Sequence, residues 1–127
     1  MESTLKPYGY ELLVDLHGCN TRRFTRPEIE EFFDGLCARI SMQKCDVHFW
    51  DDVGVAAEEQ QTNPSTKGTS AVCFILTSTI VVHTLDLLSA AYVNIFSCKY
   101  FDPKIAESFV QEFFEAKNHA ATFVERT

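Results

Sequence analysis

The chain has 127 residues, a formal net charge of −7 at pH 7 and a hydrophobic content of 46%. This length fits one domain over residues 1–127, and the apolar content excludes a disordered chain. The acidic balance argues against nucleic acid and anionic membrane surfaces as partners, because both attract basic patches.

The N-terminal part of the sequence predicts a strand followed by a helix. The segment from Gly9 to Leu16 is short, apolar and bounded by glycines, which is typical of a strand. Thr25 can cap a helix whose first turn contains Pro27, a residue favoured at that position. One buried helical stripe is predicted by the spacing of Ile29, Phe32, Phe33, Leu36 and Ile40.

The middle of the chain predicts four strands and one long loop. Residues 45–50 (CDVHFW) form the second expected strand, and the polar residues 51–69 show no periodicity and predict a loop. Residues 70–77 (SAVCFILT), 80–84 (IVVHT) and 90–96 (AAYVNIF) are strand-like and rich in β-branched residues. A loop of this length is usually functional or mobile, and its role stays open.

The C-terminal part predicts a second helix and a closing strand. Asp102 and Pro103 are a suitable cap and first-turn pair, and residues 121–125 are expected to form the last strand. The expected apolar stripe of this helix is Ile105, Phe109 and Phe113, with Ala106 and Val110 alongside. The order of elements favours an α+β fold, a two-layer α/β sandwich with a mainly antiparallel sheet.

The apolar run AVCFIL at residues 71–76 has a consequence for assembly. A run this continuous predicts a strand that is covered on both faces. Because one layer of helices covers only one face, we expect the other face to meet a second copy of the chain. The expected assembly is a homodimer with its sheets face to face, in four αββα layers.

The remaining composition gives the expected compartment and excludes common site types. Five cysteines occur without a CxxC pair, which indicates neither a disulfide framework nor a zinc knuckle. The N-terminus lacks the pattern of a signal peptide, and no apolar run approaches the ~20 residues of a membrane helix. A cytoplasmic location is therefore expected. The four histidines lie far apart, so no metal site is predicted.

A group of small polar residues lies within very apolar segments: Ser70, Thr77, Ser78, His83, Thr84 and Cys98. A buried hydroxyl or imidazole costs about 1–3 kcal/mol unless it is paired. Taken singly, each of these residues is more often a satisfied core group than a catalyst. The residue types alone leave both interpretations open.

Taken together, these residues resemble the core of the short bacterial and archaeal S-adenosylmethionine decarboxylases. In that family a Gly-x-Ser precedes an apolar strand and a cleavage-site Ser follows it. A His-Thr pair and a Cys in a Phe-[Ser/Thr]-Cys turn come next. The matching positions, at the spacing of the family, are Ser70, Ser78, His83-Thr84 and Cys98. The N-terminal segment LLVDLHGC also resembles the first strand of the family.

The resemblance implies that the chain is a proenzyme that cuts itself between Thr77 and Ser78. The Ser78 hydroxyl would attack the Thr77 carbonyl and turn the peptide bond into an ester, a step that needs a well-held backbone. His83 is the implied base for elimination of that ester. Ser70 would be a hydrogen-bonding partner that assists processing.

The implied products are a β chain of residues 1–77 and an α chain of residues 78–127. Residue 78 would become a pyruvoyl group, which binds the substrate amine as a Schiff base and takes up the electrons left by departing CO2. Cys98 is the implied acid that returns a proton to the substrate. In this family the product is decarboxylated S-adenosylmethionine, the aminopropyl donor for spermidine synthesis.

The sequence departs from the family where the substrate would bind. The family commonly has Trp-Pro-Glu after the His-Thr, whereas residues 85–87 are LDL here. The segment VHFWDD replaces a His-Phe-His-Arg-Phe-like segment, and an acidic insertion follows it. Phe49 and Trp50 are candidate stacking residues for adenine, and a role in the core is as compatible with their type.

Two other functions therefore stay open. Some relatives decarboxylate free amino acids, and a basic substrate such as ornithine or arginine would suit the acidic loop residues Asp51, Asp52, Glu58 and Glu59. These side chains are also compatible with a plainly solvated loop. A non-catalytic homologue that regulates a catalytic partner is the third possibility, although the chain keeps the implied processing residues and the acid.

Overall fold

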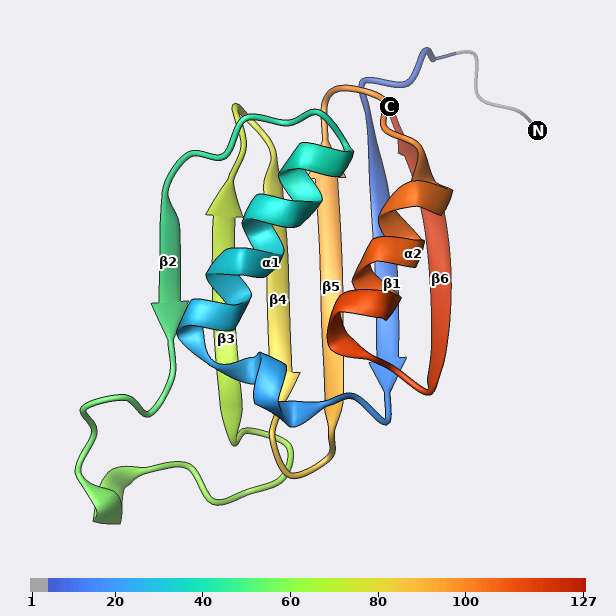
Figure 1. Ribbon diagram of the computed structural model, residues 1–127. Helices are drawn as coiled ribbons and strands as arrows, with labels where there is room; N and C mark the ends of the chain where they lie inside the picture. Colours follow the sequence, from blue (N-terminus) through green and yellow to red (C-terminus); the bar gives the residue numbers. More distant parts are fainter. Residues whose placement is uncertain (1–4) are drawn as a thin grey trace.

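Six strands form one sheet, and two helices pack on one of its faces (Figure 1). The computed structural model describes residues 5–127. The strands are β1 (Gly9–His17), β2 (Val47–Trp50), β3 (Gly68–Phe74), β4 (Thr79–Leu85), β5 (Ala90–Ser97) and β6 (Asn118–Arg126). The helices are α1 (Arg26–Arg39) and α2 (Pro103–Phe114), and short 3₁₀ turns occur at Thr21–Phe24 and Ala57–Glu59.

The strand order is β2-β3-β4-β5-β1-β6, and each neighbouring pair is antiparallel. The expected α+β class, the two layers and the antiparallel sheet are therefore confirmed. The order places β1 between β5 and the closing strand β6. It also makes β3, β4 and β5 direct neighbours, which carry most of the candidate site.

The core lies between the helices and the covered face of the sheet. The predicted stripe of α1 is confirmed, because Ile29, Phe32, Phe33 and Leu36 are buried and Ile40 is buried just past the helix end. Thr25 occupies the predicted cap position, but its side chain makes no cap hydrogen bond.

The predicted stripe of α2 is shifted by about one residue. Ile105 is 48% exposed, whereas the buried positions of this helix are Ala106, Val110 and Phe114. The shift has a physical reason, because Phe109 and Phe113 turn sideways against Phe32 of α1 instead of facing the sheet. Asp102 caps the helix as predicted, accepting bonds from the backbone N–H groups of Lys104 and Ile105.

Among residues 5–127, no helix or strand covers the second face of the sheet (Figure 1). Along β3, Ala71 and Cys73 are buried, whereas Val72 is only partly buried and Phe74 is 46% exposed. A single chain therefore covers this strand on one face, and cover of the other face by a second copy stays a prediction. We call this uncovered side the open face.

Candidate functional site

The hairpin between β3 and β4 turns at residues that are poorly suited to a turn. The backbone N–H of Ile75 donates to the carbonyl of Ser78 at 2.9 Å, which closes a two-residue loop. Leu76 and Thr77 occupy this loop with φ values of 41° and 59°. Such loops favour Asn-Gly, and a β-branched residue at positive φ costs about 1–3 kcal/mol. Backbone strain is therefore concentrated immediately before Ser78.

Ser78 is buried at the end of this turn, with 4% of its surface exposed. Its hydroxyl oxygen accepts a hydrogen bond at 3.0 Å from the backbone N–H of Cys98, which follows β5. The Thr77 hydroxyl lies 3.5 Å from the Cys98 sulfur. Pairing of β4 with β5 creates this contact, because Thr79 stands opposite Phe96. The fold thus brings Thr77, Ser78 and Cys98 together.

The thiol of Cys98 is electrostatically tuned by these neighbours. Hydrogen bonds from the side chains of Thr77 and, secondly, Ser78 stabilise its thiolate and hold the pKa of Cys98 below its ordinary value. A thiol with a pKa nearer to neutrality is better matched to proton transfer at physiological pH. This cysteine therefore differs from Cys19, whose pKa is raised to about 11 by burial.

A hollow of about 260 Å³ lies beside Ser78 and Cys98. Its wall includes the apolar side chain of Met42 and the side chain of Lys99, whose Nζ donates to the Ser41 carbonyl at 3.0 Å. Sites that enclose a whole drug-sized ligand measure about 300–1,000 Å³. This hollow is therefore large enough for only part of a nucleoside-sized molecule.

His83 and Ser70 form a second polar pair, on the open face. They stand opposite each other on β4 and β3, and the Ser70 hydroxyl lies 2.8 Å from Nδ1 of His83. Five residues separate His83 from Ser78 along an extended strand, or about 16 Å at roughly 3.3 Å per residue. A single chain therefore does not bring the His83–Ser70 pair to the buried serine.

Of the two aromatic candidates, Trp50 joins this pair and Phe49 does not. Trp50 stands opposite Ser70, is 60% exposed and lines a hollow of about 500 Å³ together with His83 and Tyr92. Phe49 faces the opposite side, packs against the core and lies under the guanidinium of Arg26. Tyr92 was missed from sequence, although alternation along β5 determines the face on which it lies. The register of β4 and β5 sets it opposite His83.

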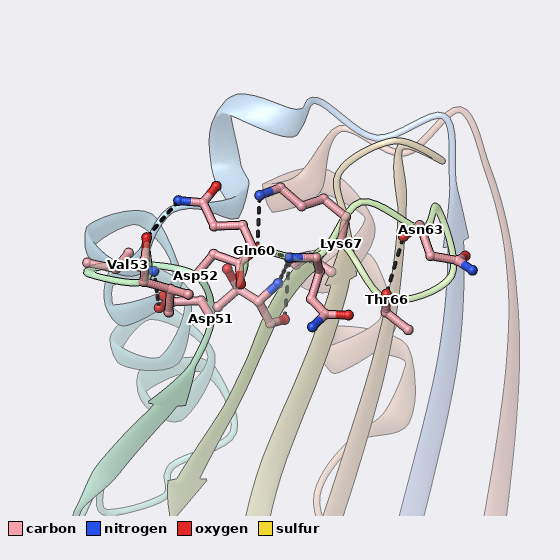
Figure 2. A network of polar contacts seen from close by, with 11 residues as sticks. Asp51, Asp52, Val53, Gln60, Asn63, Thr66 and Lys67 are labelled. Carbon is pink, nitrogen blue, oxygen red and sulfur yellow. Dashed lines mark hydrogen bonds and ion pairs between the residues drawn. The ribbon is translucent and has the colours of Figure 1, made fainter. Parts of the chain in front are cut away.

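The long loop between β2 and β3 is held by ion pairs at its base (Figure 2). Arg26, at the start of α1, donates twice to the Asp51 carboxylate, at 2.7 and 2.6 Å. Lys67 bonds to Asp52 at 2.9 Å and so joins the two ends of the loop. Further along, the Gln60 side chain donates to the carbonyl of Val55 at 3.0 Å. The loop therefore has a defined path beside the Trp50 hollow.

Asp86 lies in a separate hollow of about 530 Å³, next to the base of this loop. Burial raises the pKa of Asp86, and the positive charge of Lys67 partly opposes that rise. The Arg26 guanidinium has the opposite effect on Asp51, whose pKa is held below its usual value mainly by their hydrogen bonds. This hollow is distinct from the ones that contain Ser78 and His83.

Within residues 5–127, no group of three His, Cys, Asp or Glu side chains is placed to hold a metal ion. Across the same range, no helix is long and apolar enough to cross a membrane.

Comparison with known proteins gives two findings. Residues 10–127 match the family described as S-adenosylmethionine decarboxylase. The fold is similar to the crystal structure of the adenosylmethionine decarboxylase from Aquifex aeolicus, with a TM-score of 0.73 and 21% sequence identity over 96% of this chain and 92% of that chain. A search of curated protein sequences gives no match.

Proposed function

The chain belongs to the S-adenosylmethionine decarboxylase family, and on that premise we propose that it cuts itself between Thr77 and Ser78 and then works as a pyruvoyl-dependent decarboxylase. One observation carries this proposal. A buried serine follows two residues at strained positive φ values, and its hydroxyl is held against the backbone of Cys98. Ser78, the proposed cleavage residue, and Cys98, the proposed acid of the later reaction, thus lie next to each other.

The strained turn supplies part of the driving force for cleavage. The Ser78 oxygen attacks the Thr77 carbonyl carbon, the C–N bond breaks, and the amide nitrogen takes up a proton to leave an ester. A base then removes the Ser78 α-proton, and the Cβ–O bond breaks with release of the Thr77 carboxylate. The resulting dehydroalanine becomes an imine, which takes up water and loses ammonia to leave a ketone. The first step breaks the peptide bond that follows the strained turn, so relief of this strain favours it.

The residues around Ser78 fit the group that this reaction would create. When formed, the pyruvoyl carbonyl would supply the electron sink for loss of CO2. Cys98 lies beside residue 78, and its thiol would return a proton to the substrate carbon. Its backbone N–H remains as a hydrogen-bond donor directed at residue 78.

The separation between His83 and Ser78 supports a site shared between two chains. In such a dimer two sheets would face each other about a two-fold axis that lies between them, perpendicular to the strands. This axis would reverse the direction of the partner's strands. The His83–Ser70 pair of one chain would then lie over the Ser78 end of the other. The open face offers the apolar surface for this contact, since Leu13, Phe74 and Tyr92 are each more than one-third exposed on it. We therefore propose a face-to-face homodimer in four αββα layers.

The ion pairs of Asp51 and Asp52 favour a nucleoside substrate over a basic amino acid. Asp51 and Asp52 are already neutralised by Arg26 and Lys67 of the same chain, so neither carboxylate is available to attract a substrate cation. Trp50, by contrast, presents an exposed ring at a hollow of about 500 Å³, which suits stacking of an adenine. We therefore propose S-adenosylmethionine as the substrate, with the product serving as aminopropyl donor for spermidine synthesis.

Mass spectrometry of the purified protein tests the proposal. The expected result is two fragments, residues 1–77 and 78–127, the second blocked by a carbonyl that cyanoborohydride reduces in the presence of an amine. Release of labelled CO2 from S-adenosylmethionine, and none from ornithine or arginine, is expected to accompany it. A folded, intact chain without a carbonyl would instead mean that the protein is a non-catalytic family member.

A further inference from the structure

The closing strand β6 is a long edge strand. Within the described residues 5–127, it lies last in the order of the sheet and pairs on one side only, with β1. Figure 1 shows β6 at the end of the sheet, with no helix beyond it. All nine of its residues, Asn118–Arg126, are exposed. Its outer side therefore presents a row of backbone N–H and C=O groups that can pair with another strand.

The sequence of β6 lacks the usual protection of an exposed edge. Proteins blunt such edges with short strands, prolines, bulges or several charges. At the other edge of this sheet, β2 has only four residues. By contrast, β6 has nine residues without proline or glycine, and its central part, Ala120–Val124, carries no charge. An edge of this kind is suited to pairing with a further strand.

The strand is complementary to itself when it is paired antiparallel about Thr122. In that register Ala121 faces Phe123 of the second copy, and Ala120 faces its Val124, so each large side chain meets a small one. A register centred on a neighbouring residue loses this match. For example, centring on Phe123 places Ala121 opposite a carboxylate, that of Glu125. Cross-strand pairs of complementary size or charge are the units that stabilise a sheet.

The ends of the strand are also complementary in this register. His119 faces Glu125 of the second copy, and Asn118 faces its Arg126. Nε2 of His119 already lies 2.8 Å from a carboxylate oxygen of Glu107 on α2, which holds the ring at this end of the strand. The register places no two like charges directly opposite each other, an arrangement that would destabilise the strand pair.

An exposed aromatic cluster lies alongside the edge, on the helix side. Phe123 stacks on Tyr10 at 5.8 Å between ring centroids and meets Tyr100 edge-on at 6.4 Å. Tyr100 remains 58% exposed and Phe123 36% exposed, because α2 lies mainly over β1 and leaves this margin uncovered. A second copy placed across Thr122 would cover both rings with its own cluster.

We propose that β6 pairs antiparallel with β6 of a second copy about a two-fold axis at Thr122, joining the two six-stranded sheets into one. The contact is isologous, with the same surface used by both copies. Both edge strands are therefore paired and no filament forms. It uses a different surface from the face-to-face contact, and it does not depend on the proposed decarboxylase activity.

Disulfide trapping tests the register. Thr122→Cys places two cysteines at the axis, where opposed Cα atoms lie about 4.5–5.5 Å apart, within disulfide range. Facing sheets lie about 10 Å apart, beyond that range, so the face-to-face dimer gives no such link. Mild oxidation should give a covalent dimer whose linked peptide contains residue 122. Asn118→Cys, equally exposed but far from its own copy, should give none.

Light scattering on two matched variants tests the contact itself. Ala121→Glu puts a carboxylate against the partner's aromatic ring, and Asn118→Glu puts one against the partner's arginine. The first should halve the molar mass and the second should retain it, with unchanged circular dichroism in both. Absence of the link at residue 122, or an unchanged mass in Ala121→Glu, would overturn the proposal whether or not the chain is cut before residue 78.

Discussion

The hydroxyl of Ser78 and the backbone of Cys98 are joined by a hydrogen bond of 3.0 Å, although twenty residues separate them in the chain. The contact exists because β4 and β5 are neighbours and Cys98 follows directly on β5. It holds the serine oxygen in one position within a buried turn. A nucleophile that is held in this way loses little further conformational freedom when it reacts.

Replacement of this serine gives the first prediction. Ser78→Ala removes the attacking oxygen, so the chain should stay whole, carry no carbonyl at a new terminus and release no CO2. Gel electrophoresis and mass spectrometry measure this outcome. Ser108→Ala, on the exposed side of α2, is the matched control and should be cut normally. Cleavage in Ser78→Ala would place the scissile bond elsewhere.

The strained turn gives the second prediction. Leu76 is 62% exposed and has a φ of 41°, so Leu76→Gly removes strain with little loss of packing. Relief of about 1 kcal/mol in the precursor should slow cleavage about fivefold. The rate is followed by gel electrophoresis after synthesis of the precursor. Ser89→Gly relieves a similar φ of 50° in another turn and should leave the rate unchanged. Equal rates in all three proteins would show that strain does not contribute.

The tuned thiol gives the third prediction, measured in uncut protein that carries Ser78→Ala. Thr77→Val keeps the β-branched shape but removes the largest cause of the lowered Cys98 pKa, so this pKa should rise. Alkylation of Cys98 by iodoacetamide should then require higher pH, as read by mass spectrometry of its peptide. Thr122→Val serves as the control. The same hydrogen bond contributes to folding only above the ordinary thiol pKa, and this contribution is lost as the pH falls through the lowered value.

The ion pair at the base of the loop gives the fourth prediction. Arg26 lowers the pKa of Asp51, whose side chain is only 5% exposed, so the pair contributes above the ordinary carboxyl pKa and is lost as the pH falls through the lowered one. Asp51→Asn should reduce the free energy of unfolding by about 1 kcal/mol at pH 7, since Arg26 is partly exposed to solvent. The difference should shrink below about pH 4. Denaturation of uncut protein measures it, with Lys104→Gln as a neutral surface control.

Local patterns predicted most of the architecture, because the periodicities of strands and helices follow directly from burial on one side. They failed at the β3–β4 turn, where the expected strand over residues 70–77 ends at Phe74. No glycine or asparagine marks this turn, since Leu76 and Thr77 adopt its backbone angles at a cost. The absence of typical turn residues thus explains both why the sequence did not predict this turn and why its backbone is strained.

The sequence predicted which residues belong to the candidate site better than it predicted how they are arranged in space. Resemblance to a family identified Ser78 and His83 as site residues. Their spacing of five residues did not give the distance between them, which depends on the extended conformation of β4. Alternation along β2 could have distinguished Trp50 from Phe49, because neighbouring residues of a strand face opposite sides. In the proposed dimer the serine of one chain meets the histidine of a second chain, so their spacing along one strand could not predict how they lie.

The last prediction concerns this relation and is tested by complementation. His83→Ala and Ser78→Ala should each remain uncut when produced alone. In a face-to-face dimer of the two variants, His83 from the Ser78→Ala chain would reach the intact serine of the other chain. Co-production should therefore give cleavage of the His83→Ala chain only, which mass distinguishes. Because Ser70 is the hydrogen-bonding neighbour of His83, Ser70→Ala should complement in the same direction. If co-production leaves both chains whole, while wild-type protein is cut, the histidine acts within its own chain or has no part in processing.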